Sequence, residues 1–382
     1  MFLILCALAQ ASEGISAKGL TVSPYVDLGA TFTPNVYRTP GNPKPAAGLL
    51  LRPGVDLRWE TPDFTLGLTG VATRRQVLLV LGDDVAAWQL SRTDLDLDTT
   101  LLLRPRRPLQ VVVREQAQRK HSLAPSSLAL ADGKGLTVRQ RSITQAGVRY
   151  TPGGGALRLQ LLGRGQVDNY NVSVGTLSYL VPTSTNTRVA GGGDAEIRWS
   201  FFPRTDLVLS GGAEAYAWAG TQLPGWGWNA QLGIFGRVDY PLVINAAVGF
   251  SQLRDGGVVS TTPIDGVIGN VAAVWSPTRH QRLSLGYTKG LEDSWYAPYL
   301  AFHKVAGSYA VSPSRRLDLK TTGSTRWEAA RGISYQDLVV GGRVQADYAL
   351  SEQLSVGAQA GVDWRLQAGW DVPVSLWLHM GW

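Results

Sequence analysis

The C-terminal segment, Trp370–Trp382, constrains the fold of this chain more than any other stretch. From Val372 onward every second residue is apolar, whereas the positions between them are mainly polar or small. Successive side chains of a β-strand point to opposite faces, so the segment predicts a strand with one apolar face. No residue follows Trp382 to cover that face. This favours a strand whose apolar side meets lipid over a buried edge strand of a soluble sheet.

Eight short turn sequences divide the rest of the chain. Seven of them contain Pro, which fixes a turn and cannot continue a central strand. The turns lie at 60–63, 104–108, 151–155, 202–206, 240–241, 276–280, 312–316 and 351–353. Each turn lies between two strands, so the eight turns predict sixteen strands, and the first and last segments raise the number to eighteen. An even number of strands is the rule for single-chain bacterial outer-membrane barrels.

The segments between the turns are long and alternate in polarity. Residues 206–219, for example, place Leu207 and Leu209 on one side and Ser210 and Glu214 on the other. A transmembrane strand needs about 9–11 residues, whereas strands of soluble proteins usually have about 5–6. We therefore expect an all-β fold, a single antiparallel transmembrane β-barrel of about 18 strands with short periplasmic turns, rather than a soluble β-propeller. The expected strands are 19–32, 46–60, 64–80, 88–104, 108–120, 136–150, 156–170, 187–201, 206–219, 226–240, 241–254, 264–276, 281–291, 299–312, 315–328, 335–350, 353–366 and 370–382.

Two prolines fall inside expected strands. They are Pro53, within 46–60, and Pro373, within 370–382. A closed barrel has no edge strand on which a proline could be placed. We expect local bulges at these positions, or a strand that begins only after Pro53.

Composition agrees with a protein that meets lipid on one side and water on the other. Charged residues make up 17% of the chain, below the roughly 25% of soluble domains. Aromatic residues gather at the two ends of the expected strands and predict two girdles at the membrane interfaces. The set near the short turns is Trp59, Tyr150, Trp199, Tyr240, Trp275, Tyr309, Tyr348 and Trp382. The set near the opposite ends is Trp88, Tyr170, Trp218, Trp226, Trp295, Trp327, Trp364 and Trp370.

The N-terminus predicts export. Residues 1–11 form an apolar stretch that ends in Ala9-Gln10-Ala11, a signal-peptidase cleavage pattern. The basic residues that usually open a signal peptide are missing, so we expect the natural start to lie upstream of Met1. Cleavage would remove the only Cys, which suits an oxidising envelope compartment. The predicted organisation is a signal peptide at 1–11, a short segment at 12–18 and a barrel at 19–382.

Strand phasing predicts which charged side chains line the lumen. These charges could simply pair across neighbouring strands and keep the wall hydrated. Alternatively, an excess of unpaired arginine on the wall would favour the passage of anionic cargo. The predicted pore-lining residues are Asp94, Asp96, Asp98, Arg114, Arg139, Arg141, Arg158, Arg164, Arg198, Glu214, Arg237, Asp363 and Arg365. We expect the three aspartates to pair with arginines of adjoining strands, such as Arg75 or Arg114. Sugar-stacking aromatics on the same face would be Tyr216, Trp218 and Trp377.

Several classes of chemistry find no support. The four histidines form no metal-ligand spacing and no Ser/Asp/His pattern, so we predict neither a metal site nor an enzyme. Asp94, Asp96 and Asp98 lack the Gly and Glu of an EF-hand calcium loop. No run of basic residues suggests a nucleic-acid partner, and no cofactor is expected.

Over residues 19–382 the sequence resembles outer-membrane β-barrels. Leu376, Leu378, Met380 and Trp382 resemble the C-terminal targeting strand of that class, although its usual last residue is Phe. The resemblance implies a bacterial outer-membrane location, with lipid and the barrel-assembly machinery as partners. The nearest similarity is to eighteen-stranded barrels that accompany polysaccharide-export proteins. It implies translocation of surface polysaccharide with a periplasmic export partner, and the alternative is a diffusion porin for small solutes.

Overall fold

The structure, a computed structural model, contains only β-strands as regular elements in the part of the chain that it describes. Its described residues are 15–17, 19–34, 44–81, 91–105, 107–123, 136–153, 155–174, 187–219, 225–239, 241–254, 264–292, 300–330, 335–366 and 369–381. Within these ranges no helix is long and apolar enough to cross a bilayer. The predicted signal peptide, 1–11, and Trp382 lie outside the described residues.

Most strands are twelve residues or longer and follow one another as antiparallel neighbours. They are β1 (Ile15–Ala17), β2 (Leu20–Thr33), β3 (Ala46–Glu60), β4 (Phe64–Val80), β5 (Arg92–Leu103), β6 (Leu109–Leu123), β7 (Leu136–Tyr150), β8 (Leu157–Val174), β9 (Thr187–Phe202), β10 (Thr205–Trp218), β11 (Gly225–Asp239), β12 (Leu242–Arg254), β13 (Ile264–Thr278), β14 (Gln281–Glu292), β15 (Leu300–Ser314), β16 (Leu317–Ala330), β17 (Tyr335–Ala349), β18 (Leu354–Arg365), β19 (Gly369–Asp371) and β20 (Val374–Gly381).

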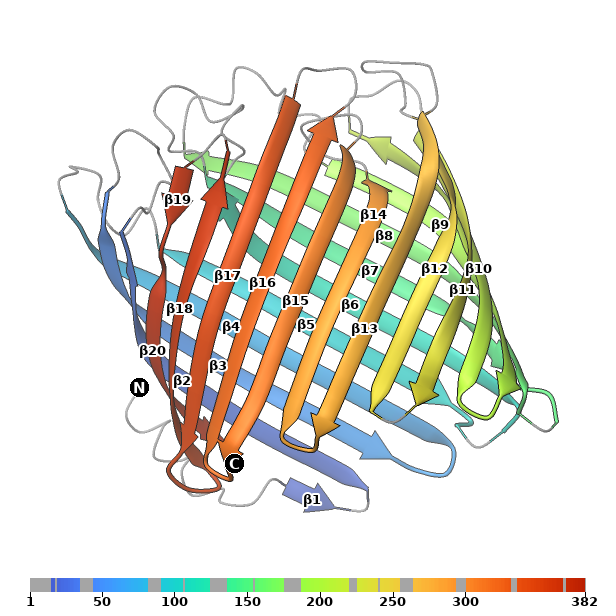
Figure 1. The fold of residues 1–382 in the computed structure, drawn as a ribbon, viewed down its shortest axis with the longest axis horizontal. Coiled ribbons are helices and arrows are strands. Elements are labelled where there is room, and N and C mark those ends of the chain that lie inside the picture. The colour runs from blue at the N-terminus through green and yellow to red at the C-terminus, as the bar shows by residue number, and fades with distance from the viewer. Residues whose placement is uncertain are drawn as a thin grey trace.

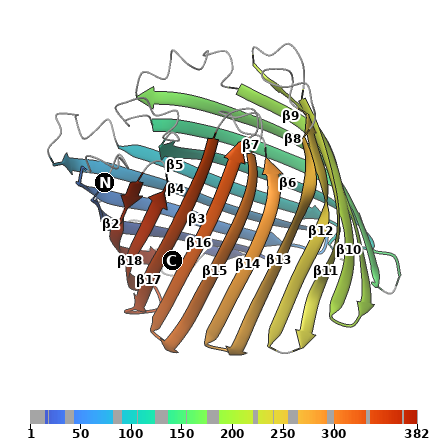
Figure 2. The ribbon, with the colours of Figure 1, turned by 45° about the horizontal axis from the view of Figure 1, so that its top comes forward.

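The sheet closes on itself. β20 pairs with β18 on one side and with β2 on the other, so β2–β18 and β20 form a closed antiparallel barrel of 18 strands (Figures 1 and 2). This confirms the predicted fold class and strand number. The closing ladder of β2 with β20, called the seam below, joins Tyr25–Phe32 to Val374–Gly381.

Cross-strand register separates a lipid face from a lumen face. Leu95 and Leu97 of β5 point outward and remain substantially exposed, as do Leu161 of β8 and Leu209 of β10. The residues between the outward positions of β5 are aspartates, which hydrogen-bond to β6 on the inner side. The period-2 alternation of the sequence therefore corresponds to lipid on one side and the lumen on the other.

Aromatic side chains lie toward the two ends of the lipid face. Near the short turns Trp59, Trp199 and Trp275 are 40–51% exposed, and toward the other end Trp327 and Trp370 are 40% and 48% exposed. Two girdles at this spacing mark the interfaces of the bilayer. By the usual orientation of such barrels the short turns face the periplasm, so the opposite end is called the outer end below.

One carboxylate lies on the lipid face at mid-height. Glu115 is opposite Thr99 and Thr144, and it accepts hydrogen bonds from the hydroxyls of Ser142, at 2.8 Å, and Thr144. It is the sixth residue after Leu109, the first residue of β6. At about 3.3 Å per residue and a tilt near 40° it lies about 15 Å above the turn, inside an apolar band about 25 Å tall.

Several details differ from the sequence-based expectations. Pro53 stays inside β3, where the ladder to β4 is interrupted between Leu51 and Gly54 without a change of register, so neither a bulge nor a later strand start is needed. Pro373 instead divides the last strand into β19 and β20. Within the predicted short segment 12–18, Ile15–Ala17 pairs with the start of β2, and β6 continues past the expected end at residue 120 to Leu123 and so includes His121.

Candidate functional site

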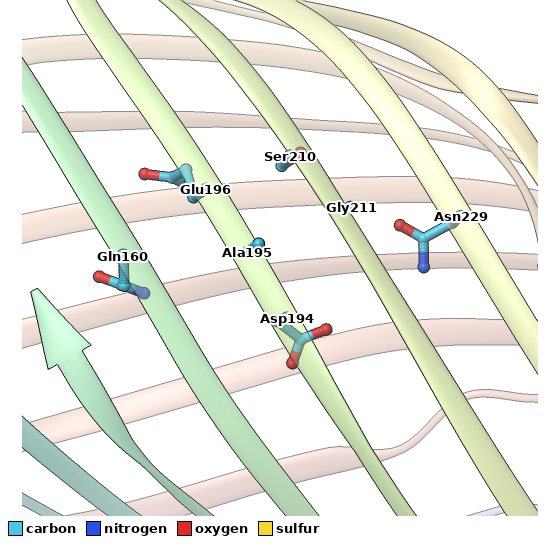
Figure 3. A pocket seen from close by; sticks show the side chains of 7 residues that line it. All are labelled: Gln160, Asp194, Ala195, Glu196, Ser210, Gly211 and Asn229. Carbon is cyan, nitrogen blue, oxygen red and sulfur yellow. The ribbon is translucent and has the colours of Figure 1, made fainter.

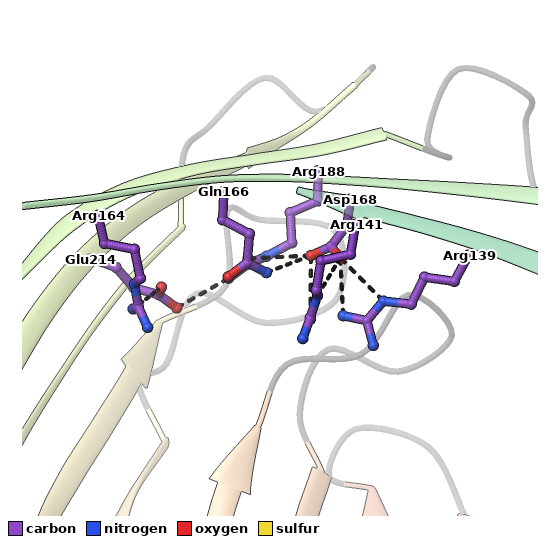
Figure 4. Close-up of polar contacts among 7 residues, drawn as sticks. All are labelled: Arg139, Arg141, Arg164, Gln166, Asp168, Arg188 and Glu214. Carbon is purple, nitrogen blue, oxygen red and sulfur yellow. Dashed lines mark hydrogen bonds and ion pairs between the residues drawn. The ribbon is translucent and has the colours of Figure 1, made fainter. Parts of the chain in front are cut away.

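The densest charge network on the lumen wall lies near the outer end of β7–β10. We call Arg139 and Arg141 of β7, Arg164 of β8 and Arg188 of β9 the upper arginine cluster (Figure 4). Antiparallel register brings them together, because Arg141 is opposite Asp168 and Asp168 is opposite Arg188. Alternation alone places these side chains on one face, and the register then sets which of them meet.

Asp168 is the centre of this network. It is fully buried and accepts hydrogen bonds from Arg139 Nε at 3.1 Å, Arg141 Nε at 2.7 Å and the amide of Gln166. Arg188 Nη1 lies 3.8 Å from its second oxygen. A buried carboxylate with this many donors holds the guanidinium groups in fixed positions.

The cluster carries more positive than negative charge. Arg164 and Arg188 share Glu214 of β10, at 2.6 and 3.0 Å, so four arginines surround two carboxylates. The side chains of Arg139 and Arg141 remain 35% and 29% exposed, whereas that of Arg188 is almost fully buried. The side chain of Arg164 is also 28% exposed, so the excess charge is presented to the lumen by Arg139, Arg141 and Arg164.

Tyr216 packs against Arg188, the buried arginine of the cluster. Its ring lies under the Arg188 guanidinium at 4.6 Å, and its hydroxyl donates to the Arg254 carbonyl at 3.1 Å. The residue is only 3% exposed, so the ring does not present a stacking face to a sugar. Trp218, also predicted to stack on sugars, packs against Tyr170 with ring centroids 5.8 Å apart, and its stacking role stays a prediction.

A polar hollow lies nearer the middle of the same wall. It is lined by lumen-facing side chains of β8–β11, and it encloses about 490 Å³ including space open to solvent (Figure 3). The side chains are Gln160, Asp194, Glu196, Ser210 and Asn229. A Cβ on Gly212 would lie 2.3 Å from Asp194 Oδ1, so glycine at this position makes room for the carboxylate.

A second group of arginines lies toward the short turns. We call Arg114, Arg149, Arg158 and Arg198 the lower arginine group. Arg198 contacts Glu196 at 3.2 Å and Asp206 at 3.6 Å, and Arg149 donates to Gln160 at 3.0–3.1 Å. Arg158 stands directly opposite Arg198 in the ladder. The wall of β6–β10 thus presents arginines at two heights with the polar hollow between them.

The aspartates of β5 form a column on the adjoining wall. Asp98 and Asp96 accept from the amides of Gln116 and Gln118, at 2.7 and 3.2 Å. Asp96 also lies 3.5 Å from Lys120, and Asp94 lies 2.8 Å from His121. Amides, a lysine and a histidine thus bind this column, and its pairing with arginines stays a prediction.

The remaining predicted lining residues lie on the opposite wall or cannot be placed. Arg343 lies 3.9 Å from Asp363, and Arg365 lies 3.8 Å from Asp337. These pairs leave no local excess of positive charge comparable to that of the upper arginine cluster. Arg237 falls in β11, but its side chain is outside the described part of the structure.

The seam contains an ion network that sequence spacing did not reveal. Asp27 of β2 is 2% exposed and binds Arg52 Nε at 2.6 Å and the Nδ1 atom of His379. Ser355 is the cross-strand neighbour of His379, yet His379 directs Nδ1 to Asp27 on the other side. Trp377 lies flat against the backbone at Gly357, where a Cβ would approach its ring to 2.2 Å.

Three of the four predicted targeting residues, Leu376, Leu378 and Met380, lie on the lipid face of β20, and the fourth, Trp382, is outside the described residues. Leu376 is 55% exposed, and Leu378 and Met380 share its side of the strand. Their role in targeting stays a prediction. Arg188 and Arg149 are lining residues that were not predicted from the sequence. The alternation could have identified both, because Arg188 lies on the same face of β9 as Glu196, and Arg149 lies on the same face of β7 as Arg141.

Comparisons with known proteins support the fold. No family model matches the chain, and no curated protein matches it. Among solved structures, the FrpB iron transporter from Neisseria meningitidis (F3-3 variant) is 7% identical with a TM-score of 0.50, and the match covers 92% of this chain. The chain spans 62–63% of the FrpB chains that it matches.

Two further matches extend over nearly the whole of both chains. OpdK from Pseudomonas aeruginosa, solved with vanillate, is 12% identical with a TM-score of 0.50, and the match covers 94% of this chain and 98% of that one. OccK2 (OpdF) from Pseudomonas aeruginosa, in complex with glucuronate, is 14% identical with a TM-score of 0.50, covering 95% and 96%. The closed barrel and these neighbours define the class: the chain is an outer-membrane β-barrel protein, located in the bacterial outer membrane. Its structural neighbours are transporters and porins.

Proposed function

We propose that this protein is a diffusion pore for small anionic solutes. The observation that carries the proposal is the excess of arginine over carboxylate on one wall of the lumen, where Arg139 and Arg141 remain exposed. Fixed positive charge raises the local concentration of anions and lowers that of cations in a water-filled passage. The interior of a barrel of 18 strands is too wide for side chains to fill, so a water-filled lumen remains.

The arrangement favours solutes that combine a carboxylate with hydroxyl groups. The upper and lower arginines supply donors for the carboxylate at two heights. Between them the amide, hydroxyl and carboxylate groups of the polar hollow supply partners for hydroxyl groups. Vanillate and glucuronate, the molecules named with two structural neighbours, are both carboxylates, which supports this substrate class.

Polysaccharide export with a periplasmic partner is the second candidate. The observation that favours it is the shortness of the connections at the outer end, which have twelve residues or fewer between successive strands. Such connections offer little chain for a loop that narrows the pore. The charge distribution and the porin-like neighbours support the diffusion pore better.

Ion selectivity in planar bilayers tests the first proposal. We expect the wild-type pore to favour anions. Two charges lost at roughly 8 Å from the path of an ion change its energy in water by about 0.5 kcal/mol each. Arg139→Gln with Arg141→Gln should therefore raise the energy of an anion and lower that of a cation by about 1 kcal/mol each, which lowers the anion-to-cation permeability ratio about 30-fold at low salt. Arg74→Gln with Lys289→Gln removes two charges from the lipid face instead and is the matched control.

A cation-selective wild-type pore, or a double variant with unchanged selectivity, would contradict the proposal. Gene deletion separates the two candidates. Loss of uptake of small carboxylates with normal surface polysaccharide supports diffusion. Loss of surface polysaccharide with normal uptake supports export.

A further inference from the structure

Two arginines point away from the lumen, toward the membrane. Arg119 of β6 is opposite Leu95, which is 44% exposed on the lipid face. Arg74 of β4 is opposite Leu51, which shares the side of β3 on which Leu49 is 51% exposed. Cross-strand partners point to the same face of a sheet, so both arginines lie on the lipid face.

Both arginines lie at the height of the outer girdle. Each is ten residues beyond the start of its strand at the short turns, as Trp327 is on β16. At about 3.3 Å per residue and a tilt near 40°, ten residues rise about 25 Å, which is the height of the apolar band. The guanidinium groups therefore meet the headgroup layer of the outer leaflet.

Neither arginine has a carboxylate partner among the described residues. Arg74 donates to Thr93 Oγ1 and Gln76 Oε1, each at 2.9 Å, and these neutral groups orient it without neutralising its charge. Arg119 has a buried Nε without a hydrogen-bond partner, and its cross-strand neighbour Gln140 is an exposed amide. Glu115, the carboxylate lower on β6, is bound by two hydroxyls of β7.

The spacing of the two arginines suits one phosphorylated headgroup. One strand, β5, separates them, and Thr93 and Leu95 on that strand are their respective neighbours. Two strand spacings and one two-residue step place their Cα atoms roughly 12 Å apart. Guanidinium groups bind phosphate oxygens through paired N–H donors, and an unpaired cation at the edge of the apolar band is stabilised by such an anion.

We propose that Arg74 and Arg119 form a binding site for the phosphate groups of lipopolysaccharide in the outer leaflet. The occupant is an amphiphile rather than a free solute. Leu95, opposite Arg119, and Leu97, two residues nearer the short turns, are exposed on the same face and offer contact to acyl chains. The site is on the opposite side of the wall from the lumen arginines and is independent of what the pore conducts.

Binding of lipid A to the folded barrel in detergent tests the site. A surface arginine near an anionic headgroup contributes about fivefold in affinity, so Arg74→Gln with Arg119→Gln should weaken binding about 25-fold. Lys289→Gln removes one cation from the lipid face on β14, on the side of Leu285, and is the control for loss of a lipid-face charge away from the site. The control should bind within about twofold of wild type. Retention of the heat-dependent gel shift verifies that each variant is folded.

Dephosphorylated lipid A identifies the group that is recognised. Wild type should bind it as weakly as the double variant binds the phosphorylated form, and the double variant should not distinguish the two lipids. Equal binding of both lipids by wild type would overturn the proposal, as would an equal loss in Lys289→Gln. Displacement of lipid A by inorganic phosphate alone would show a free-anion site and would likewise overturn it.

Discussion

Removal of Asp27 should weaken the seam of the barrel. The β2–β20 ladder contains eight residue pairs, whereas the neighbouring β2–β3 ladder contains fourteen. Asp27 adds to the short ladder a buried carboxylate that binds Arg52 on β3 and His379 on β20. One side chain thus links three consecutive strands of the wall.

The expected loss of stability depends on how exposed Arg52 and His379, the partners of Asp27, are to water. Removing one member of a buried ion pair usually costs about 3–5 kcal/mol, because the remaining charge is left unpaired. The side chains of Arg52 and His379 are 47% and 37% exposed, so water can solvate both after the change. We therefore expect Asp27→Ala to lower the free energy of unfolding by about 2–3 kcal/mol. Asp27→Asn keeps one acceptor and should cost about 1–2 kcal/mol.

Urea unfolding in lipid vesicles, followed by tryptophan fluorescence and by gel mobility, measures this effect. Glu60→Gln is the control, because Glu60 and Arg58 form an exposed pair whose loss should cost less than about 1 kcal/mol. If Asp27→Ala unfolds at the same urea concentration as wild type, the seam does not depend on this network. If Glu60→Gln loses as much stability as Asp27→Ala, general charge effects explain the result.

Three further changes test the lumen wall. Asp168→Asn leaves the arginines around it without their shared carboxylate, so we expect higher anion selectivity in bilayers together with lower stability in urea; unchanged selectivity would contradict this. Gly212→Ala places a methyl group against Asp194 and should shift the Asp194 carboxylate into the hollow. Single-channel recordings should then show weaker block by hydroxy-carboxylates. Gly357→Ala meets the Trp377 ring and should cost about 1–3 kcal/mol of stability, whereas wild-type stability would show that the ring can move aside.

The sequence was sufficient to predict the architecture, because its determinants are local. Proline-containing turns mark where strands end, and period-2 alternation assigns residues to the lipid or the lumen face. Leu209 and Glu214 were assigned to opposite faces in this way, and the structure places them there. Eighteen strands followed from eight turns without any knowledge of which strand closes the barrel.

The ion networks could not be predicted, because they depend on register between distant segments. Arg164 and Glu214 are 50 residues apart, and Asp27 and His379 are 352 apart. A shift of two residues in any ladder would preserve the faces but change every partner. For the same reason alternation alone could not reveal that the register places Gln116 and Gln118 beside Asp98 and Asp96.

The seam also determines the order in which the barrel can form. Each neighbouring hairpin closes a loop of a few residues, but the contact of Asp27 with His379 closes 352. Loop-closure entropy grows as about (3/2)RT ln n, which is about 5 kcal/mol for this contact and about 1 kcal/mol for a tight turn. Hairpins should therefore assemble first, and the seam should close last, once the C-terminal strand is available. Until then the edge of β2 over Tyr25–Phe32 is unpaired, and this edge needs protection from other chains during assembly.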